Sequence, residues 1–403
     1  MMSYSPLTGG FIDKAFPGEA WIAELRNRFP VEREIDRILT DKLRRRSGTG
    51  YTGVGLDEVS AKLKAFLAGQ IDGDFSISDL KWLGGGASKL QTSFMLDRPG
   101  QGGAQKMVLR MDLPQSNAET SRRREFELLR AIGSTLPVPE PLWIDADGAF
   151  LPYPGTICSF VSGVTKPTGR VGQVTGLGID FGPDLRAKLG EQVARDMGAL
   201  HSWDWASADL PSYDVPQPGT QAMEWHLNNW LRVWEEDSGE EEPIINFASL
   251  WLKDNIPATE TLSMIHCDFR AGNFLFDEGT EQITTWLDWE LARIGDRHED
   301  LALMSLECMG HWSEAGDVFL TNGFMPEERF LALYEKYSGL SVDPKRLAYY
   351  RIFHAYRAAI ILLATGYRAV KGGKTHQDMT LSIMLAFGAR LLDDLRKLLE
   401  EHA

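Results

Sequence analysis

The sequence predicts an α+β fold in two lobes, a small antiparallel sheet followed by a larger and mostly helical lobe. Between residues 77 and 161, short alternating or apolar segments are separated by turn residues, which is typical of antiparallel strands. After about residue 180, apolar residues recur mainly at helical spacing. Because a sheet-rich part precedes a helical part, we expect an α+β arrangement with a ligand cleft between the lobes.

We expect residues 1–55 to form an N-terminal helical extension. Apolar residues recur there at helical spacing, at Val31, Ile35, Ile38, Leu39 and Leu43. The helix that they predict ends in the basic cluster Arg44–Arg46. Cations suit the C-terminal end of a helix dipole, so we interpret this cluster as a solvated helix end, with a site for an anion or a partner as the alternative.

Residues 56–163 predict a small antiparallel sheet that carries one inserted helix. A short helix is expected over 57–68 and the inserted helix over 118–132. The sequence predicts extended chain over 77–83, 90–96, 106–111, 150–152 and 156–161.

Residues 164–403 predict the helical lobe. Helices are expected over 184–201, 222–236, 248–253, 327–337, 344–365 and 377–402. Residues 263–291 are the exception, since loop residues there lie between two short strand-like runs, 273–276 and 283–287. Trp230 and Trp234 are four residues apart on one predicted helix, so we expect core packing rather than an aromatic pocket for a choline-like cation.

The composition restricts the class of partner. The formal net charge is −15, which argues against nucleic acid and anionic membranes as partners. The three cysteines are an odd number without paired spacing, so we expect a reducing compartment and neither a disulfide framework nor a four-cysteine zinc site. No apolar run approaches the roughly 18 residues of a membrane span. A cytoplasmic protein is therefore expected.

One group of polar residues has the types and the spacing expected of a catalytic site. Asp268 is followed five residues later by Asn273, and Asp288 ends the next apolar run. Metal-assisted phosphoryl transfer requires a carboxylate that accepts the proton of the acceptor hydroxyl, together with an amide oxygen and a second carboxylate that hold Mg²⁺. The alternative is that each of these residues merely caps a turn.

These motifs also carry a resemblance. His266-Cys-Asp268-Phe-Arg-Ala-Gly-Asn273, Asp288-Trp-Glu-Leu-Ala and Gly-Asp-Arg-His-Glu-Asp300 resemble the catalytic and metal-binding loops of the aminoglycoside phosphotransferase-like and choline kinase-like family, which has the protein-kinase-like fold. The sequence around these motifs is most similar to the branch of the family that is fused in some proteins to acyl-CoA dehydrogenases. The resemblance covers roughly Leu56 to the C-terminus and implies a nucleotide-binding lobe over 56–163 and a catalytic and acceptor-binding lobe over 164–403.

The resemblance implies roles for the loop residues. Asp268 is the expected catalytic base, and Asn273 and Asp288 are the expected Mg²⁺ ligands. His266 is expected to orient the loop, with direct acid–base chemistry as the lesser alternative. Arg270 is expected either to reach the transferred phosphate or an anionic acceptor, or to form an ordinary salt bridge.

Two further residues of these motifs have open roles. Glu290 is expected either near the metal or as a solvated carboxylate. Asp300 precedes an apolar helical run, so it is expected to cap that helix. Bracing of the catalytic loop, as in the family, is compatible with such a position.

The first lobe is expected to supply the nucleotide clamp. A glycine cluster lets backbone N–H groups approach phosphates, and we assign this role to Gly84, Gly85, Gly86 and Ser88. Alone, such a cluster is more often a hairpin turn, but its order before the other motifs favours phosphate binding. The family pattern also implies a basic residue, Arg110, paired with Glu125 on the inserted helix.

The resemblance also implies a hinge segment between the lobes, and two residues depart from the family pattern. Ser159 and Val161 lie in the segment expected to meet the adenine edge. Arg110 stands where kinases commonly have Lys, and guanidinium differs from ammonium in shape and hydrogen bonding. Cys267 stands where the family usually has Gly, and we expect a small buried thiol there.

The sequence thus predicts an ATP- or GTP-dependent, Mg²⁺-requiring O-phosphotransferase that acts on a hydroxyl of a small molecule. The acceptor stays open among aminoglycosides, choline-like compounds and acyl or other metabolites. A catalytically weak or inactive nucleotide-binding scaffold is the alternative, suggested by Arg110 and Cys267. A third reading is a metal-dependent hydrolase that uses the same acidic cluster without nucleotide.

Overall fold

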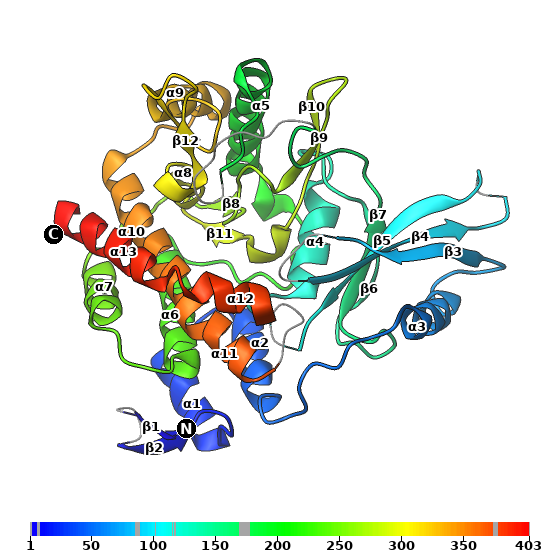
Figure 1. Ribbon diagram of the computed structural model, residues 1–403, viewed down its shortest axis with the longest axis horizontal. Helices are drawn as coiled ribbons and strands as arrows, with labels where there is room; N and C mark the ends of the chain where they lie inside the picture. The colour runs from blue at the N-terminus through cyan, green and yellow to red at the C-terminus, as the bar shows by residue number, and fades with distance from the viewer. Residues whose placement is uncertain are drawn as a thin grey trace.

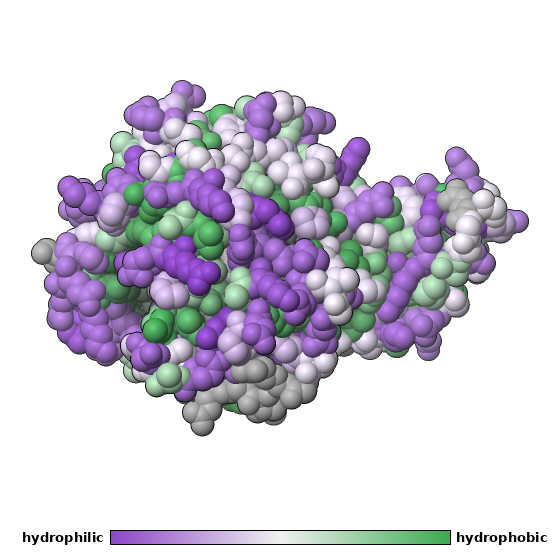
Figure 2. All heavy atoms as spheres, turned by 90° about the horizontal axis from the view of Figure 1, so that it is seen from above, coloured by the Kyte–Doolittle hydropathy of each residue, from purple (hydrophilic) through white to green (hydrophobic). Residues whose placement is uncertain are grey.

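The computed structural model describes residues 2–5, 9–84, 89–100, 102–114, 116, 118–168, 178–373 and 378–402. A five-stranded antiparallel sheet forms most of a smaller lobe, and most of the helices gather in a larger one (Figure 1). Figure 2 shows the smaller lobe as a projection from the larger body, with hydrophilic and hydrophobic residues interspersed on the face drawn. The predicted α+β, two-lobe fold is therefore confirmed.

The sheet of the smaller lobe has the strand order β3-β4-β5-β7-β6. Its strands are β3 (Ser76–Trp82), β4 (Lys89–Asp97), β5 (Gln105–Asp112), β6 (Pro141–Asp145) and β7 (Gly155–Ser159). The expectation of extended chain over 150–152 is wrong, because the strand lies earlier, at β6. The carboxylate of Asp145 accepts the backbone N–H groups of Ala149, Phe150 and Leu151, which closes a turn over this segment.

The two faces of this sheet differ in chemistry. Leu109 and Met111 of β5 pack on the apolar side of α3 (Leu56–Ala68). Because side chains alternate along a strand, Arg110 and Asp112 point to the opposite face, the one that carries α4 (Arg122–Ile132). Lys89 of β4 is the cross-strand partner of Asp112. The face of the sheet toward the larger lobe is therefore lined with charge.

The larger lobe contains helices and short hairpins. Its helices are α5 (Pro183–Ser202), α6 (Gln221–Asp237), α7 (Pro243–Asp254), α8 (His298–Met304), α9 (Glu327–Ser338), α10 (Pro344–Ile360), α11 (Tyr367–Lys371), α12 (Asp378–Leu385) and α13 (Gly388–His402). Single turns lie at η1 (Trp205–Ser207), η2 (Trp289–Leu291), η3 (Glu307–Met309) and the π-helical η4 (Ile361–Gly366). The strands are β8 (Ser263–Ile265), β9 (Phe274–Asp277), β10 (Gln282–Trp286), β11 (Arg293–Gly295), β12 (His311–Trp312) and β13 (Phe319–Leu320).

The tryptophans of α6 pack as the i, i+4 spacing predicts. Trp230 is buried in the core of the larger lobe. Trp234 is partly exposed and packs against the same core. The indole N–H of Trp230 donates to His226 on the same helix. Core packing is thus confirmed for this pair, and the cation pocket is not supported.

The N-terminal segment holds more structure than the single helix predicted for it. A hairpin, β1 (Met2–Ser5) and β2 (Gly10–Asp13), precedes α1 (Glu19–Arg28) and α2 (Arg33–Arg44). Apolar side chains of both helices, such as Leu25 and Leu43, join the core of the larger lobe. Across the described ranges, no helix combines the length and apolar character needed to cross a membrane.

Candidate functional site

The loop after β8 holds Asp268 in place through His266. The His266 ring is fully buried, and its Nε2 donates to the carbonyl of Leu287 at 2.9 Å, while its Nδ1 accepts the N–H of Asp268 at 3.2 Å. A carbonyl only accepts and an amide N–H only donates, so the ring is neutral with its proton on Nε2. Both ring nitrogens are therefore used to position the loop, as the sequence predicts.

Asp300 of α8 also holds this loop, through hydrogen bonds to its backbone. Its carboxylate accepts the N–H of His266 at 2.8 Å and of Cys267 at 2.7 Å, and it contacts His201 Nε2 at 3.1 Å. The residue that precedes α8 is Arg297, so Asp300 lies inside the helix and does not cap it. These contacts support the bracing role rather than the capping role.

Cys267 is buried and adopts a φ of +64°. This left-handed backbone conformation favours glycine, because a side chain there crowds the following carbonyl. The family's usual Gly at this position thus has a local conformational reason. Burial raises the pKa of the Cys267 thiol well above its ordinary value, which fits the small buried thiol expected from the sequence.

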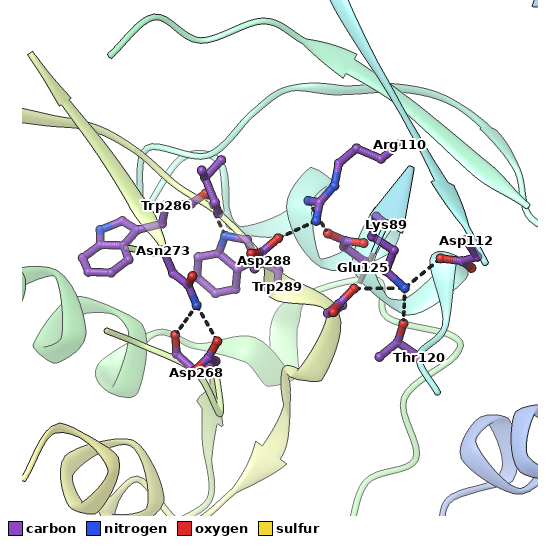
Figure 3. A network of polar contacts seen from close by, with 12 residues as sticks. Lys89, Arg110, Asp112, Thr120, Glu125, Asp268, Asn273, Trp286, Asp288 and Trp289 are labelled. Carbon is purple, nitrogen blue, oxygen red and sulfur yellow. Dashed lines mark hydrogen bonds and ion pairs between the residues drawn. The ribbon is translucent and has the colours of Figure 1, made fainter. Parts of the chain in front are cut away.

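The Asp268 carboxylate accepts hydrogen bonds from Arg270 and from Asn273, and Figure 3 shows the contact with Asn273. Arg270 Nε donates to Oδ1 at 2.9 Å, and Asn273 Nδ2 donates to Oδ2 at 2.5 Å and to the Asp268 carbonyl at 2.9 Å. The side chain of Asp268 is 24% exposed. The carboxylate is therefore oriented by two donors and remains open on one side.

The β9–β10 hairpin brings Asn273 beside Asp288. Phe274 of β9 pairs with Trp286 of β10, and the N–H of Leu287 donates to the Asn273 carbonyl at 2.7 Å. Asp288 then adopts a φ of +57°, which turns the chain into η2 at the end of the hairpin. Asn273 and Asp288 therefore lie at the same end of the hairpin, next to the Asp268 loop.

Arg110 connects this end of the hairpin to the sheet. Its guanidinium contacts Glu125 of α4 at 3.0 Å and Asp288 at 2.5 Å. Burial opposes the charged form, but the carboxylates of Glu125, Asp288 and Glu290 outweigh it and raise the pKa of Arg110. The Arg110–Glu125 pair expected from the family pattern is therefore present in the structure.

Lys89 also belongs to this network, which was not predicted from the sequence. Its buried Nζ contacts Asp112 at 2.8 Å, Thr120 at 2.9 Å and Glu290 at 3.1 Å (Figure 3). Glu290 is also paired with Arg122 at 3.2 Å, and it is buried rather than solvated. Burial raises its pKa, but these cations outweigh burial and lower the pKa of Glu290 to about 2. The available signal was the position of Lys89 directly after the glycine cluster.

The expected nucleotide-binding end is described only in part. Gly84 follows β3, whereas Gly85, Gly86 and Ser88 lie outside the described residues. The N–H of Ser159 donates to the Glu140 carbonyl at 2.9 Å, so this group is already used between β6 and β7. Among the described residues, the backbone of Val161 makes no hydrogen bond. Of the two hinge candidates, Val161 is therefore the one whose N–H is unused among the described residues.

The side chains present fit a magnesium ion. Mg²⁺ is usually held by one or two carboxylates together with substrate phosphates, rather than by an all-protein cage. Asp288 uses Oδ1 toward Arg110 and is 39% exposed, so its second oxygen is accessible. Asn273 uses its Nδ2 toward Asp268, and its amide oxygen is left as a donor atom for a metal. Within the ranges described, no cluster of three or more His, Cys, Asp or Glu side chains is arranged to hold a metal ion.

The two-lobe fold is that of the kinase-like phosphotransferases. A family profile described as APH, phosphotransferase enzyme family, matches residues 83–340, more than half of the chain. The protein belongs to this family. The match includes the glycine cluster, Arg110, and the Asp268 and Asp288 loops.

Curated relatives carry acyl-CoA dehydrogenase names. The "Probable acyl-CoA dehydrogenase IBR3" of Arabidopsis thaliana is 24% identical over 296 residues, which are 68% of this chain and 35% of that protein. The human "Acyl-CoA dehydrogenase family member 11" is 28% identical over 224 residues, 55% of this chain and 27% of that protein. The chain therefore spans about a third of the length of these relatives, which agrees with the fused branch that the motifs resemble.

Solved structures share the fold. A "putative aminoglycoside phosphotransferase" from Ralstonia eutropha JMP134 superimposes with a TM-score of 0.61 at 21% identity, covering 85% of this chain and 98% of that one. A macrolide 2′-phosphotransferase type I gives a TM-score of 0.53 at 18% identity, with coverages of 83% and 99%. At these identities the likeness concerns the fold alone.

Proposed function

We propose that this protein is a nucleotide-dependent, Mg²⁺-requiring O-phosphotransferase that phosphorylates a hydroxyl group of a small molecule. ATP or GTP is the proposed phosphoryl donor. The observation that carries the proposal is the convergence of Asp268, Asn273 and Asp288 at one end of the β9–β10 hairpin, facing Arg110 of the sheet. Phosphoryl transfer needs positioning and charge neutralisation more than covalent chemistry, and these side chains supply both.

Asp268 is the proposed catalytic base. One oxygen accepts a hydrogen bond from Arg270 and the other from Asn273, which restrains the orientation of the carboxylate proposed to accept the acceptor's hydroxyl proton. His266 and Asp300 act as positioning residues, because both contact the loop backbone beside Asp268. Arg270 is adjacent to the base, so its remaining N–H groups are available to a transferred phosphate or an anionic acceptor.

Asn273 and Asp288 would hold Mg²⁺ through oxygen ligands, and the bound ion would neutralise charge on the nucleotide phosphates. Arg110, positioned by Glu125, contributes a fixed positive charge at the same place. Gly84, Gly85, Gly86 and Ser88 are the proposed phosphate loop, and Val161, with Ser159 before it, is the proposed hinge toward the base. This assignment divides the chain into an extension (1–55), a nucleotide lobe (56–163) and a catalytic lobe (164–403).

The names of the curated relatives favour a hydroxylated acyl compound as the acceptor class. We also propose a cytoplasmic location, since all three cysteines are free thiols, as is usual in a reducing compartment. The net charge of −15 argues against nucleic acid and anionic membranes as partners.

The test is acceptor-stimulated nucleotide consumption by the purified protein. Mg-ATP and Mg-GTP are titrated into the millimolar range, and hydroxylated acyl compounds, aminoglycosides and choline are then screened as acceptors. The proposal is refuted if no Mg-nucleotide binds. If the protein is a scaffold, it binds nucleotide but shows no turnover, so Asp268→Asn changes no activity. If it is a metal-dependent hydrolase, it releases phosphate or cleaves esters without nucleotide.

A further inference from the structure

A cavity of about 720 Å³ lies between the N-terminal extension and the smaller lobe. One wall is the C-terminal end of α2 with the segment that follows it, and the other is the loop before α4 with the first turn of that helix. The neighbouring ends of β4 and β5, at Lys89 and Asp112, form the floor. The lining includes none of Asp268, Asn273, Asp288 and Arg110, although it shares Lys89, Asp112, Thr120 and Arg122 with the ion-pair network that adjoins them.

The lining is positively charged in an otherwise negative chain. Eight of its residues are Lys or Arg and four are Asp or Glu, whereas the chain as a whole carries −15. Burial raises the pKa of Glu119, one of the four acidic residues, while the nearby cations Lys42, Arg45 and Lys89 oppose this shift. A concave surface with an excess of one sign of charge favours ligands of the opposite sign.

Most of these cations are already paired, and one is not. Arg44 is paired with Glu19, Arg46 with Asp237, and Arg123 with Asp147. The Arg45 side chain is exposed at the cavity and forms no hydrogen bond or ion pair with any residue that the structure describes.

The opposite wall adds backbone donors. Ser121 caps α4 by accepting the N–H of Arg124, while the N–H groups of Arg122 and Arg123 find no acceptor in the described part of the chain. Free N–H groups at the start of a helix favour anions. Residues with unused hydrogen-bond donors therefore line the cavity on both walls.

We propose that this cavity binds a small molecule that carries at least two phosphate groups. Arginine and helix N-terminal N–H groups both match the oxygens of phosphate, and the volume lies in the range of small-molecule sites. Two groups are needed because the donors lie on two walls, one built by α2 and one by α4. The N-terminal extension would then have a binding role, since it supplies the Arg45 wall. This inference does not depend on the proposed phosphotransferase activity.

The test measures pyrophosphate binding to the full chain by isothermal titration calorimetry, without metal or nucleotide. Arg45→Glu is compared with Arg329→Glu, which reverses an exposed arginine of α9 outside this cavity. We expect Arg45→Glu to weaken binding roughly tenfold, the loss of about one charge-assisted contact, and Arg329→Glu to leave it unchanged. Adding Arg123→Glu to Arg45→Glu should weaken binding further. Matching urea midpoints of the single variants establish that the fold is intact.

Hydrogen exchange locates the ligand. Pyrophosphate should protect residues 41–50 and 118–124, the two cavity walls, and this protection should be lost in Arg45→Glu. Protection confined to residues 105–110 and 266–290 would assign the ligand to the site around Arg110 and Asp288 and overturn the proposal. Equal affinity of the wild type and Arg45→Glu, or no binding at millimolar pyrophosphate, would overturn it as well.

Discussion

Lys89 and Glu290 form an ion pair between the two lobes, and its contribution can be measured with a double-mutant cycle. The two side chains are only 1% and 11% exposed, with 3.1 Å between Nζ and Oε2. Removing one partner of a buried pair costs about 3–5 kcal/mol in general. Each residue here keeps another partner, Lys89 with Asp112 and Glu290 with Arg122, so we expect about 2–3 kcal/mol for Lys89→Met or Glu290→Gln alone.

The stability of the double variant shows whether the two residues are coupled. Two independent losses would add to about 4–6 kcal/mol, whereas direct coupling of the pair should limit the double variant to about 3–4 kcal/mol. Urea unfolding at pH 7 gives the four free energies of unfolding. The exposed pair Arg44–Glu19 is the matched control and should show no measurable coupling. A Lys89–Glu290 coupling no larger than that of the control pair would refute the interlobe role.

The pH dependence gives an independent check on the same pair. Burial opposes ionisation of Glu290, but Lys89, Arg122 and Arg110 outweigh it and hold its pKa at about 2. An unfolded glutamate titrates near about 4.3. The stabilisation is therefore complete above that value and is lost as the pH falls toward about 2. The difference in unfolding free energy between wild type and Glu290→Gln should shrink from pH 6 to pH 3, and a constant difference would contradict this reasoning.

Three further predictions concern single residues. Asp268→Asn should lower kcat by about 10²–10⁴-fold and leave the nucleotide Kd within about twofold, measured by steady-state kinetics and calorimetry; an unchanged kcat would remove Asp268 from catalysis. Arg110→Lys should lower kcat/KM about 10–100-fold, because one ammonium group cannot reproduce the guanidinium contacts with both Glu125 and Asp288; an equally active variant would contradict this. Only Cys308 is an exposed cysteine, so a thiol reagent should modify one thiol quickly in the native protein and none in Cys308→Ser; fast modification of a second thiol would show that a buried cysteine is accessible.

The loop geometry could be predicted from the sequence because its contacts are local. Asp268 and Asn273 lie in one turn, so their spacing alone brings the carboxylate to the amide. Asn273 and Asp288 flank a hairpin, whose register brings its two ends together. The α+β division was predictable for the same reason, since strand and helix periodicities are properties of short segments.

Contacts between distant segments escaped prediction. Nothing in the sequence around Lys89 indicates a partner in the Asp288–Glu290 turn, and Glu290 alone was equally compatible with a solvated carboxylate. Residues 150–152 were assigned to a strand because they are apolar, but the carboxylate of Asp145 draws their N–H groups into a turn. Side-chain acceptors that capture several backbone donors override periodicity, and the sequence does not reveal which acceptor does so.

Asp288 and Glu290 lie on one turn, η2, and each takes a cation from the smaller lobe: Arg110 for Asp288 and Lys89 for Glu290. Exposure separates their roles. The Arg110–Asp288 pair is 12% and 39% exposed, whereas the Lys89–Glu290 pair is almost fully enclosed. On the proposed function, nucleotide phosphates and a metal ion would compete for the Arg110–Asp288 pair first, since it is the more exposed of the two. The proposed function thus assigns phosphate binding to Arg110, which would exchange Asp288 for a phosphate, and attachment of the lobes to the enclosed pair of Lys89 and Glu290.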